Sequence, residues 1–546
     1  MNEAVRNLAW ADAFIAALAA AGVRDAVLAP GARCAPLALA ALRRPELTCH
    51  VINDERAAGY FALGLGKASD RPALVITTSG TASANLLPAI VEANLACVPL
   101  IVLTADRPLE MLGWGANQTI DQTKLYGEHV RAFHALPLPN DAIPVSWLSA
   151  LAARLVTTAL SPSPGPVHAN LPFREPLLPE AIPAPPPLPP PIVSYRPAAL
   201  MPASLETVAA RLSGQPGVIV CGTANYPSGF ADAIARLSAA LDAPVIAEAL
   251  SNLRCGPHDK SRFISHAARL LRHTELSQPA WVLRFGRFPV SRPIERWLAR
   301  LGDAFHILVA PPGDWPDPLW RSTTRIEGDP LAIAQALASS CRSASAEFLQ
   351  AWQAAETAVI MPDAFFEGSI ARTLFTTLPA GSQCFVGNSL AIRAVDAFGG
   401  MRDAPLTLHG NRGASGIDGN LATAAGIAAA TGAPTVALVG DQTVLHDATS
   451  LALCARHGVV VIVLNNHGGG IFEHLPFAAA LPPALFERGW IAPQACDFAH
   501  LAAAFGIEYR QATTLDQLAA ALVPPLGACL IEAVIDRHLS LKCFGA

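Results

Sequence analysis

The chain has 546 residues, of which 52% are hydrophobic and 15% are charged, and its formal net charge at pH 7 is −5. This length exceeds what one hydrophobic core serves, so we expect several domains, and the composition excludes a disordered chain. Because no long basic or acidic block occurs, neither nucleic acid nor an anionic membrane surface is expected as a partner.

The cysteines and the N-terminal segment indicate the compartment. The 11 cysteines are scattered and none forms a CxxC pair, which favours a reduced, cytoplasmic protein over a disulfide framework or a zinc site. The N-terminal segment has acids at Glu3 and Asp12 and no basic cluster ahead of its apolar part. We therefore expect an amphipathic helix that ends at Gly22 and not a signal peptide.

In the first third of the chain, strand-like and helix-like patterns alternate. Apolar, β-branched runs at 25–31, 72–80 and 98–106 each lead into a polar or glycine-bearing loop, and a helical pattern at 55–68 lies between two of them. Such alternation is typical of a parallel sheet that is covered by helices on both faces.

A proline-rich stretch at 175–198 follows, which can form neither a helix nor an inner strand and is expected to be an extended linker. Two more groups of strand patterns come after it, separated by a helical stretch near 339–357. The first group comprises 217–222, 243–248 and 281–286, and the second comprises 384–389, 435–441, 459–466 and 529–536.

These patterns predict an α/β fold with three doubly wound parallel-sheet domains. We place the first domain at 1–180, the linker at 181–200, the central domain at 201–345 and the third domain at 346–546. The uncharged run 420–440 is long enough for a membrane span, but the sequence TGAP interrupts it. We expect a helix, a turn and a buried strand there, and no membrane as a partner.

Polar side chains follow two strand patterns of the third domain. Asp441 ends one run, and Asn465 and Asn466 end the next, ahead of the glycines 468–470. The offset of 25 residues (466 − 441) leaves room for one helix, so the two strands can be neighbours, and ligands bind outside the carboxyl ends of such strands. A carboxylate, an amide oxygen and a glycine carbonyl suit Mg²⁺, and the glycines let the backbone approach a diphosphate. Gly-Asp alone is more often turn chemistry, and the added Asn-Asn makes the pattern specific.

This pair of segments resembles the diphosphate–magnesium motif of thiamine diphosphate enzymes, which reads Gly-Asp-Gly and, after a helix-length gap, Asn-Asn. Gln442 replaces the last glycine of the first part. The resemblance implies that Asp441, Asn466 and the carbonyl of Gly468 bind Mg²⁺, or Mn²⁺ in its place, and that this cation holds the diphosphate of the cofactor.

The same resemblance implies a glutamate in the first domain. Glu55 follows a strand pattern and opens a helix. In thiamine diphosphate enzymes this glutamate hydrogen-bonds N1′ of the aminopyrimidine ring, and a buried carboxylate beside a ring nitrogen is an arrangement that tunes a pKa. The alternative is an ordinary acid at a helix N-terminus, favoured there by the helix dipole.

More of the chain resembles one family within that class, the 2-succinyl-5-enolpyruvyl-6-hydroxy-3-cyclohexene-1-carboxylate (SEPHCHC) synthases. The matching segments include APGARCAPLALA, TADRPLE followed by GANQ, and NRGASGIDG, of which the last two are not shared by thiamine diphosphate enzymes in general. The matching positions imply these cofactor-binding residues: Glu55, Ser79, Gly80, Asn388, Ser415, Gly416, Ile417, Gly440, Asp441, Asn466, Gly468, Gly469, Ile471 and Phe472.

The resemblance implies a transferase of menaquinone biosynthesis that decarboxylates 2-oxoglutarate and adds the succinyl carbanion to isochorismate in a 1,4 sense. Both substrates are dianions, and guanidinium groups bind carboxylates bidentately, so an arginine-rich site is expected. Any single arginine is more often a surface charge or a structural ion pair. The matching positions imply these substrate-binding residues: Arg33, Arg107, Asn117, Gln118, Arg292, Ser389, Arg393 and Arg412.

Three positions leave questions open. Ala32 and Cys34 stand where the family has serines, and the hydrogen bond that Ala32 cannot make is typically worth about 1 kcal/mol. We expect Cys34 to be a small packed residue, because no partner histidine is evident. Ile417 matches a bulky apolar residue beneath the cofactor, although ordinary core packing would also explain it.

The resemblance further implies a homodimer or homotetramer whose active sites lie at the subunit interface. One alternative is another thiamine diphosphate-dependent 2-oxoacid carboligase or decarboxylase with a different acceptor, which Ala32 suggests. A second alternative is a non-catalytic dimeric scaffold, against which Glu55, Asp441 and Asn466 argue. A nicotinamide-binding Rossmann enzyme is poorly supported, because no clean GxGxxG lies between a strand and a helix with a following acid.

Overall fold

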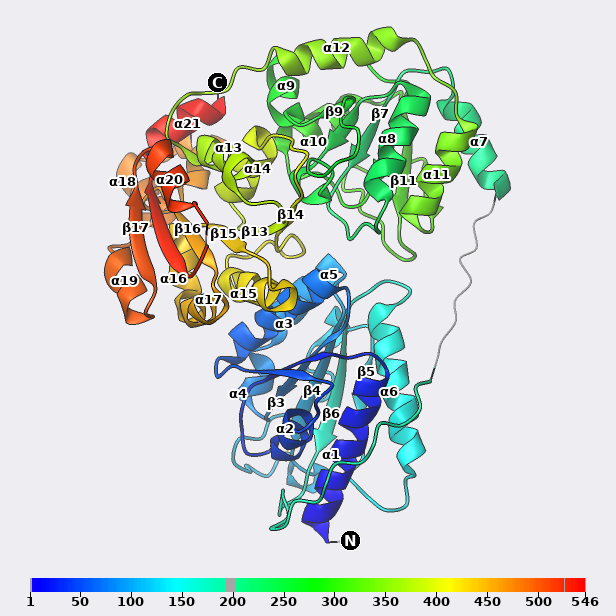
Figure 1. Ribbon diagram of the computed structural model, residues 1–546, viewed down its shortest axis with the longest axis vertical. Coiled ribbons are helices and arrows are strands. Elements are labelled where there is room, and N and C mark those ends of the chain that lie inside the picture. Colours follow the sequence, from blue (N-terminus) through cyan, green and yellow to red (C-terminus); the bar gives the residue numbers. More distant parts are fainter. Residues whose placement is uncertain (1, 193–201, 525, 546) are drawn as a thin grey trace. The chain divides into compact units, whose positions relative to one another are not determined.

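The computed structural model describes residues 2–192, 202–524 and 526–545. It contains three six-stranded parallel sheets with flanking helices (Figure 1), which confirms the predicted α/β fold. Contacts group the chain into two compact units. The first unit comprises the described residues up to 192 with Asn411–Gly432 and Leu445–Val459, and the second unit comprises the other described residues.

The first sheet belongs to the first unit and has the strand order β2-β1-β3-β4-β6-β5. Its strands are β1 (Asp25–Leu28), β2 (Thr48–Val51), β3 (Ala73–Thr77), β4 (Leu100–Asp106), β5 (Phe133–Ala135) and β6 (Pro166–Pro172). Its helices are α1 (Glu3–Ala20), α2 (Ala35–Leu42), α3 (Glu55–Ser69), α4 (Thr81–Ala84), α5 (Leu87–Ala96) and α6 (Val145–Leu160). Helices α1, α2 and α6 share one core with this sheet, α3 and α5 contact each other, and the inner strands β3 and β4 are buried along their whole length.

Helix α3 also packs against α15 (Asn420–Thr431), which belongs to the first unit although it lies far along the chain. Glycines permit this close approach. A Cβ atom at Gly64 would overlap the carbonyl oxygen of Thr423, and one at Gly426 would overlap that of Phe61. Helix α17 (Leu451–His457) contacts α15 as well, so this unit joins segments that are hundreds of residues apart.

The second unit holds the other two sheets. The second sheet has the order β12-β11-β10-β7-β8-β9. Its strands are β7 (Gly217–Cys221), β8 (Val245–Ala247), β9 (Phe263–Ile264), β10 (Trp281–Phe285), β11 (Phe305–Ala310) and β12 (Thr324–Glu327). The helices of this part are α7 (Pro202–Leu212), α8 (Phe230–Leu241), α9 (Ala267–His273), α10 (Arg292–Arg300), α11 (Pro330–Ser340) and α12 (Ala346–Thr357).

The third sheet has the order β14-β13-β15-β16-β18-β17. Its strands are β13 (Ser382–Val386), β14 (Leu406–His409), β15 (Thr435–Gly440), β16 (Val460–Asn465), β17 (Glu508–Ala512) and β18 (Cys529–Val534). The remaining helices are α13 (Glu367–Thr377), α14 (Leu390–Phe398), α16 (Asp441–His446), α18 (Pro483–Phe486), α19 (Phe498–Ala504), α20 (Leu515–Ala521) and α21 (Arg537–Gly545). The central strands β15 and β16 are almost wholly buried, as expected for the β-branched runs that form them.

Several local predictions can be compared with these elements. The uncharged run 420–440 forms a helix, a turn and a buried strand as expected, and no helix of the described residues is both long and apolar enough for a membrane span. The expected helix near 339–357 is wrong in part, because it breaks at 341–345, where the Ser345 side chain caps α12. Residues 181–192 of the expected linker form neither helix nor strand, and residues 193–200 lie outside the described residues.

Candidate active site

The carboxyl ends of four strands gather predicted residues at one edge of the first sheet. Arg33 lies in the loop after β1, Glu55 follows β2, Ser79 and Gly80 follow β3, and Arg107 directly follows β4. These strands are parallel and occupy neighbouring places in the order β2-β1-β3-β4. The segments after them therefore emerge at the same edge, where open parallel sheets bind their ligands.

Arg107 is buried in this edge and donates a hydrogen bond to the hydroxyl of Ser79. The side-chain nitrogen of Gln118 donates to the Ser79 carbonyl at 3.0 Å, and a Cβ atom on Gly80 would lie 2.9 Å from the Gln118 side chain. Burial lowers the pKa of Arg107, and the nearby cation of Arg33 lowers that pKa further. The carboxylates of Asp106 and Glu175 act in the opposite direction, so this edge combines two close guanidinium groups with two acids.

The remaining predicted residues of this edge differ in exposure. Arg33 is only 6% exposed and donates to the Phe173 carbonyl at 2.9 Å and to the Glu175 carboxylate at 2.7 Å. Asn117 has an exposed side chain. Burial raises the pKa of the Cys34 thiol to about 11, which fits a packed residue and not a nucleophile.

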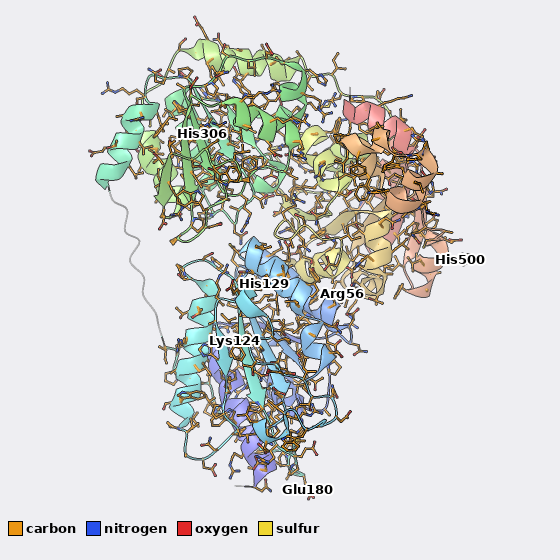
Figure 2. The ribbon with its side chains drawn as sticks, turned by 180° about the vertical axis from the view of Figure 1, so that it is seen from behind. Arg56, Lys124, His129, Glu180, His306 and His500 are labelled. Atoms are coloured by element: carbon orange, nitrogen blue, oxygen red, sulfur yellow. The ribbon has the colours of Figure 1, made fainter. Side chains whose placement is uncertain are left out.

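Glu55 is the first residue of α3 and is half-buried. The Asp54 side chain caps this helix, and Arg56, labelled in Figure 2, donates to the His446 carbonyl at 3.3 Å and pairs with Asp447 at 3.5 Å. Among the described residues, none donates a hydrogen bond to the Glu55 carboxylate. Its neighbours thus hold the helix start firmly while its own oxygens remain available to a ligand.

The segment 411–419 lies in the same unit as Glu55. Glu92 of α5 accepts hydrogen bonds from two successive backbone N–H groups of this segment, at 2.9 and 2.6 Å, and Tyr60 of α3 donates to Asp418 at 2.5 Å. Ile417 is half-buried in this segment. The predicted residues Arg412, Ser415, Gly416 and Ile417 therefore share one compact unit with Glu55.

A buried polar network lies beneath the 79–80 loop. Gln122 accepts the Gly80 N–H at 3.1 Å and donates to Asn170 at 2.7 Å, and the Thr104 hydroxyl donates to the same Asn170 oxygen at 2.7 Å. His168 Nε2 lies 2.7 Å from the Thr104 oxygen. Because the Thr104 proton is already used, His168 must donate from Nε2 and remain neutral, and its Nδ1 has no partner among the described residues.

Because His168 is buried and neutral, we expect the stability of the folded protein to fall in acid. Burial lowers the pKa of His168 from 6.5 to about 3, so between these values the unfolded chain binds a proton that the folded protein does not. Its contribution to stability is complete above pH 6.5 and falls with decreasing pH by up to about 1.4 kcal/mol per unit. Urea unfolding from pH 7 to pH 4 should therefore show a steeper loss of stability for the wild type than for His168→Gln. Parallel pH profiles would contradict the prediction.

In the second unit, the third sheet presents a comparable edge. Asp441 follows β15, and Asn466 and Gly468 follow the neighbouring strand β16. Asp441 is 5% exposed and accepts a hydrogen bond from the backbone N–H group of Gln442 at 2.8 Å. The three predicted metal ligands therefore lie on adjacent loops at one edge of one sheet.

These residues fit a divalent cation bound to a diphosphate. Burial raises the pKa of Asp441 to about 6, because its carboxylate is removed from water with little positive charge to offset it. The Asn466 carbonyl oxygen accepts no hydrogen bond from the described residues. Gly468 has φ +126° and a Cβ atom there would overlap the Ile491 carbonyl, so only glycine fits this turn. Hard oxygen donors of this kind suit Mg²⁺.

The other residues predicted in this region surround the same edge. Asn388 and Ser389 follow β13, the neighbour of β15, and Ser389 has φ +65°, which is strained for a residue other than glycine. Arg393 on α14 donates to the Ser389 carbonyl at 2.7 Å. Gly440 ends β15, and the residues Gly469, Ile471 and Phe472 continue the glycine-rich loop beyond Gly468.

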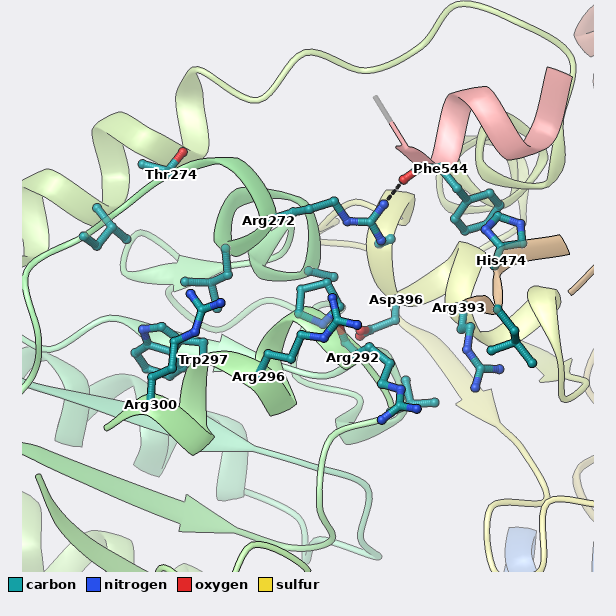
Figure 3. A pocket seen from close by; sticks show the side chains of 18 of the residues that line it. Arg272, Thr274, Arg292, Arg296, Trp297, Arg300, Arg393, Asp396, His474 and Phe544 are labelled. Carbon is teal, nitrogen blue, oxygen red and sulfur yellow. Dashed lines mark hydrogen bonds between the residues drawn. The ribbon is translucent and has the colours of Figure 1, made fainter. Parts of the chain in front are cut away.

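A cavity of ≈ 800 Å³ in the second unit has many basic side chains in its wall (Figure 3). It brings together two predicted substrate residues, Arg292 of α10 and Arg393 of α14, and it also reaches Ile471. Burial lowers the pKa of His474 in this wall, and the cations of Arg272 and Arg393 lower it further. The cavity is therefore strongly electropositive and suits a small anion.

The sequence-based prediction missed three arginines of this cavity, which are Arg272, Arg296 and Arg300. Arg296 and Arg300 follow Arg292 at intervals of four residues, so all three lie on one face of α10. This spacing could have identified them from the sequence. Arg272 comes from α9 and donates to the Phe544 carbonyl, a contact across 272 residues that no local pattern indicates.

Two buried side chains hold the segments that carry the predicted arginines. Glu248 is 2% exposed and accepts the N–H groups of Thr223, at 2.9 Å, and Val290, at 3.1 Å, shortly before α10 begins. Arg254 pairs with Asp396 of α14 at 2.9 Å, with both side chains almost fully buried. These contacts fix the cavity wall on both sides.

Comparisons with known proteins match the two segments of the chain that carry these sheet edges. A family model described as thiamine pyrophosphate enzyme, N-terminal TPP binding domain, matches residues 9–125, and the corresponding C-terminal TPP binding domain model matches residues 395–530. The first match spans Glu55 and Arg107, and the second spans Asp441 and Asn466. The fold and these matches define a thiamine pyrophosphate enzyme, and its cofactor is thiamine diphosphate, as predicted.

Similar proteins identify one family within this class of enzymes. A protein of Dechloromonas aromatica (strain RCB) is 42% identical over 94% of this chain and 96% of its own length, and one of Halobacterium salinarum (strain ATCC 29341 / DSM 671 / R1) is 39% identical over 99% and 97%. A protein of Geobacillus kaustophilus (strain HTA426) is 40% identical over 91% and 89%. Each is named 2-succinyl-5-enolpyruvyl-6-hydroxy-3-cyclohexene-1-carboxylate synthase. The chain belongs to this family of thiamine diphosphate-dependent enzymes, which confirms the predicted resemblance.

Proposed function

We propose that this enzyme decarboxylates 2-oxoglutarate and adds the succinyl unit to isochorismate in a 1,4 sense, giving the SEPHCHC of menaquinone biosynthesis. The observation that carries this proposal is the similarity, over nearly the whole chain, to synthases named for that product. The electropositive cavity and the paired arginines of the first sheet edge support it, because both substrates are dianions.

The chain's own residues would hold the cofactor and move one proton. The electron sink for the loss of CO₂ is supplied by thiamine diphosphate when it is bound. Asp441, Asn466 and the Gly468 carbonyl would bind Mg²⁺, or Mn²⁺ in its place, and through it the diphosphate. Glu55 would share a proton with N1′ of the aminopyrimidine ring, which a half-buried carboxylate at a helix start can do.

The remaining predicted residues would position the ring and the substrates. Ile417 would support the cofactor, whose backbone contacts would come from the glycine-rich segments. Arginines and amides would orient the two anions, so orientation and electrostatics would supply much of the catalysis. The proposed substrate residues are Arg33, Arg107, Asn117, Gln118, Arg292, Ser389, Arg393 and Arg412.

We propose a pyrimidine-binding domain at 1–180, a linker at 181–200, a central domain at 201–345 and a diphosphate-binding domain at 346–546. The two family models fall within the first and last of these. We further propose a homodimer or homotetramer with the active sites at the subunit interface, in which Glu55 and Asp441 of different copies serve one cofactor. The 11 cysteines, all free, favour a cytoplasmic location.

Mass spectrometry of the products formed from 2-oxoglutarate and isochorismate tests the activity. We expect a product that contains the succinyl unit and depends on isochorismate. Consumption of 2-oxoglutarate with no isochorismate-dependent product would contradict the proposal. It would favour a carboligase or decarboxylase with a different acceptor, which Ala32 in place of the family's serine supports.

Arg107 should serve the substrates more than the cofactor. We expect Arg107→Ala to raise the KM for an anionic substrate about tenfold or more, since a hydrogen bond to a charged group contributes about 1.5–3 kcal/mol. The affinity for thiamine diphosphate, measured by titration, should stay near the wild-type value. Arg174→Ala is a matched control, because Arg174 is exposed and its one ion pair among the described residues is with exposed Glu110. Equal losses of substrate and cofactor affinity would indicate a structural arginine.

A further inference from the structure

Glu367, the first residue of α13, is a buried acid that the proposed mechanism does not use. Its side chain has 0% exposure and accepts two hydrogen bonds. One comes from the side-chain nitrogen of Asn466 at 3.0 Å, and the other comes from the Ser540 hydroxyl of α21. The carboxylate thus joins two helices to the loop that carries a proposed metal ligand.

This contact determines the orientation of the Asn466 amide. An ionised carboxylate can only accept hydrogen bonds, so the end of the amide that faces Glu367 must be the NH₂ group. The carbonyl oxygen then points to the opposite side, and it accepts no hydrogen bond from the residues that the structure describes. Space is tight as well, because a Cβ atom at Gly470 would lie 2.9 Å from the Asn466 nitrogen.

The preceding asparagine offers an internal comparison. Asn465 donates to Glu532 at 2.5 Å, and its carbonyl oxygen accepts the backbone N–H of His467 at 3.1 Å. Both ends of the Asn465 amide are therefore occupied within the protein. Two neighbouring amides are each held by a buried glutamate, but only Asn466 keeps an oxygen free for an external partner.

We propose that Glu367 is a positioning residue, which holds the Asn466 amide so that its carbonyl oxygen faces the cation bound by Asp441 and Gly468. The proposal rests on the proposed function, in which Asn466 is a metal ligand. Partners of metal ligands fix ligand orientation, and their removal typically weakens metal affinity by about 10–100-fold. Glu367 would act in this way through a hydrogen bond, without touching the metal.

Mg²⁺ titration of the full chain, with saturating thiamine diphosphate after removal of metal by a chelator, tests the proposal. The readouts are the dissociation constant for Mg²⁺ and the thermal unfolding midpoint. Glu367→Gln should bind Mg²⁺ nearly as well as the wild type, because its carbonyl can accept from Asn466 while its NH₂ donates to Ser540. Glu367→Met fills similar space without an acceptor and should weaken Mg²⁺ binding about 10–100-fold.

Glu532→Met is the matched control, since it removes the partner of the amide that is not a proposed ligand. We expect it to lower the unfolding midpoint without a comparable loss of Mg²⁺ affinity. Unchanged affinity in Glu367→Met would overturn the proposal, and so would equal weakening in Glu367→Gln, because that would identify the charge and not the amide orientation as the cause.

If Glu367→Met does not fold, Glu367→Asp decides the question. It keeps the charge but shortens the reach to Asn466 by one methylene, so we expect weaker Mg²⁺ binding, and wild-type affinity would overturn the proposal. Failure of the proposed metal ligands, on which this inference rests, has a different signature, because Asp441→Ala would then bind Mg²⁺ and thiamine diphosphate as the wild type does. Failure of the proposed acceptor reaction would appear only in the products and would leave the Mg²⁺ titrations unchanged.

Discussion

Glu55→Gln is expected to lower turnover by about 10²- to 10⁴-fold, the range that general acid–base catalysis typically contributes. Glutamine has nearly the same size but cannot share a proton with a ring nitrogen. The half-buried carboxylate at the start of α3 accepts no hydrogen bond from the described residues, so the substitution should change the stability of the fold little. Steady-state decarboxylation of 2-oxoglutarate measures the loss, and size-exclusion chromatography shows whether the assembly persists.

Glu3→Gln is the matched control for this substitution. Glu3 is also an acid in the first turn of a helix, and it pairs with Arg6 at 3.1 Å. The helix-dipole interpretation of Glu55 predicts similar, small stability effects for both variants and no effect on turnover. Retained activity in Glu55→Gln would therefore support the dipole interpretation and contradict the proton-sharing role.

Asp441→Ala is expected to weaken Mg²⁺-dependent binding of thiamine diphosphate by at least about 100-fold. Removal of a residue that only hydrogen-bonds to a metal ligand typically weakens metal affinity by about 10–100-fold, and removal of a ligand itself should weaken it at least as much. Asp441 contributes the single carboxylate of the proposed ligand set, so its loss removes the charge that attracts the cation. Titration of the cofactor with and without Mg²⁺, followed by intrinsic fluorescence, measures this effect. The wild type should lose affinity when the metal is chelated, whereas the variant should respond little to the metal.

Gln442→Ala serves as the control for Asp441→Ala. The Asp441 carboxylate accepts a hydrogen bond from the backbone of Gln442 and not from its side chain, so this contact survives the substitution. We expect cofactor affinity near the wild-type value. If Asp441→Ala bound the cofactor as tightly as Gln442→Ala, with the same response to Mg²⁺, the proposed metal site would be wrong.

The α/β class was predictable because its signals are local. A buried β-branched run followed by a glycine or an acid predicts both a strand and the edge at which its loop emerges, as at Asp441. The same local reasoning was wrong in part near 339–357, where composition favoured a continuous helix, whereas α11 ends at Ser340 and a new helix begins at the Ser345 cap. The arginines at 296 and 300 were missed although their spacing on α10 was visible in the sequence.

The sequence by itself determined the α/β class, the main buried strands and the kinds of side chain at their ends, because these depend on neighbouring residues. Only the tertiary structure decided which buried partners hold those side chains. Glu367 lies 99 residues before Asn466, and Ser540 lies 173 residues after Glu367. The physical reason is that hydrogen-bond orientation depends on close contact between elements, and spacing along the chain does not record which elements pack together.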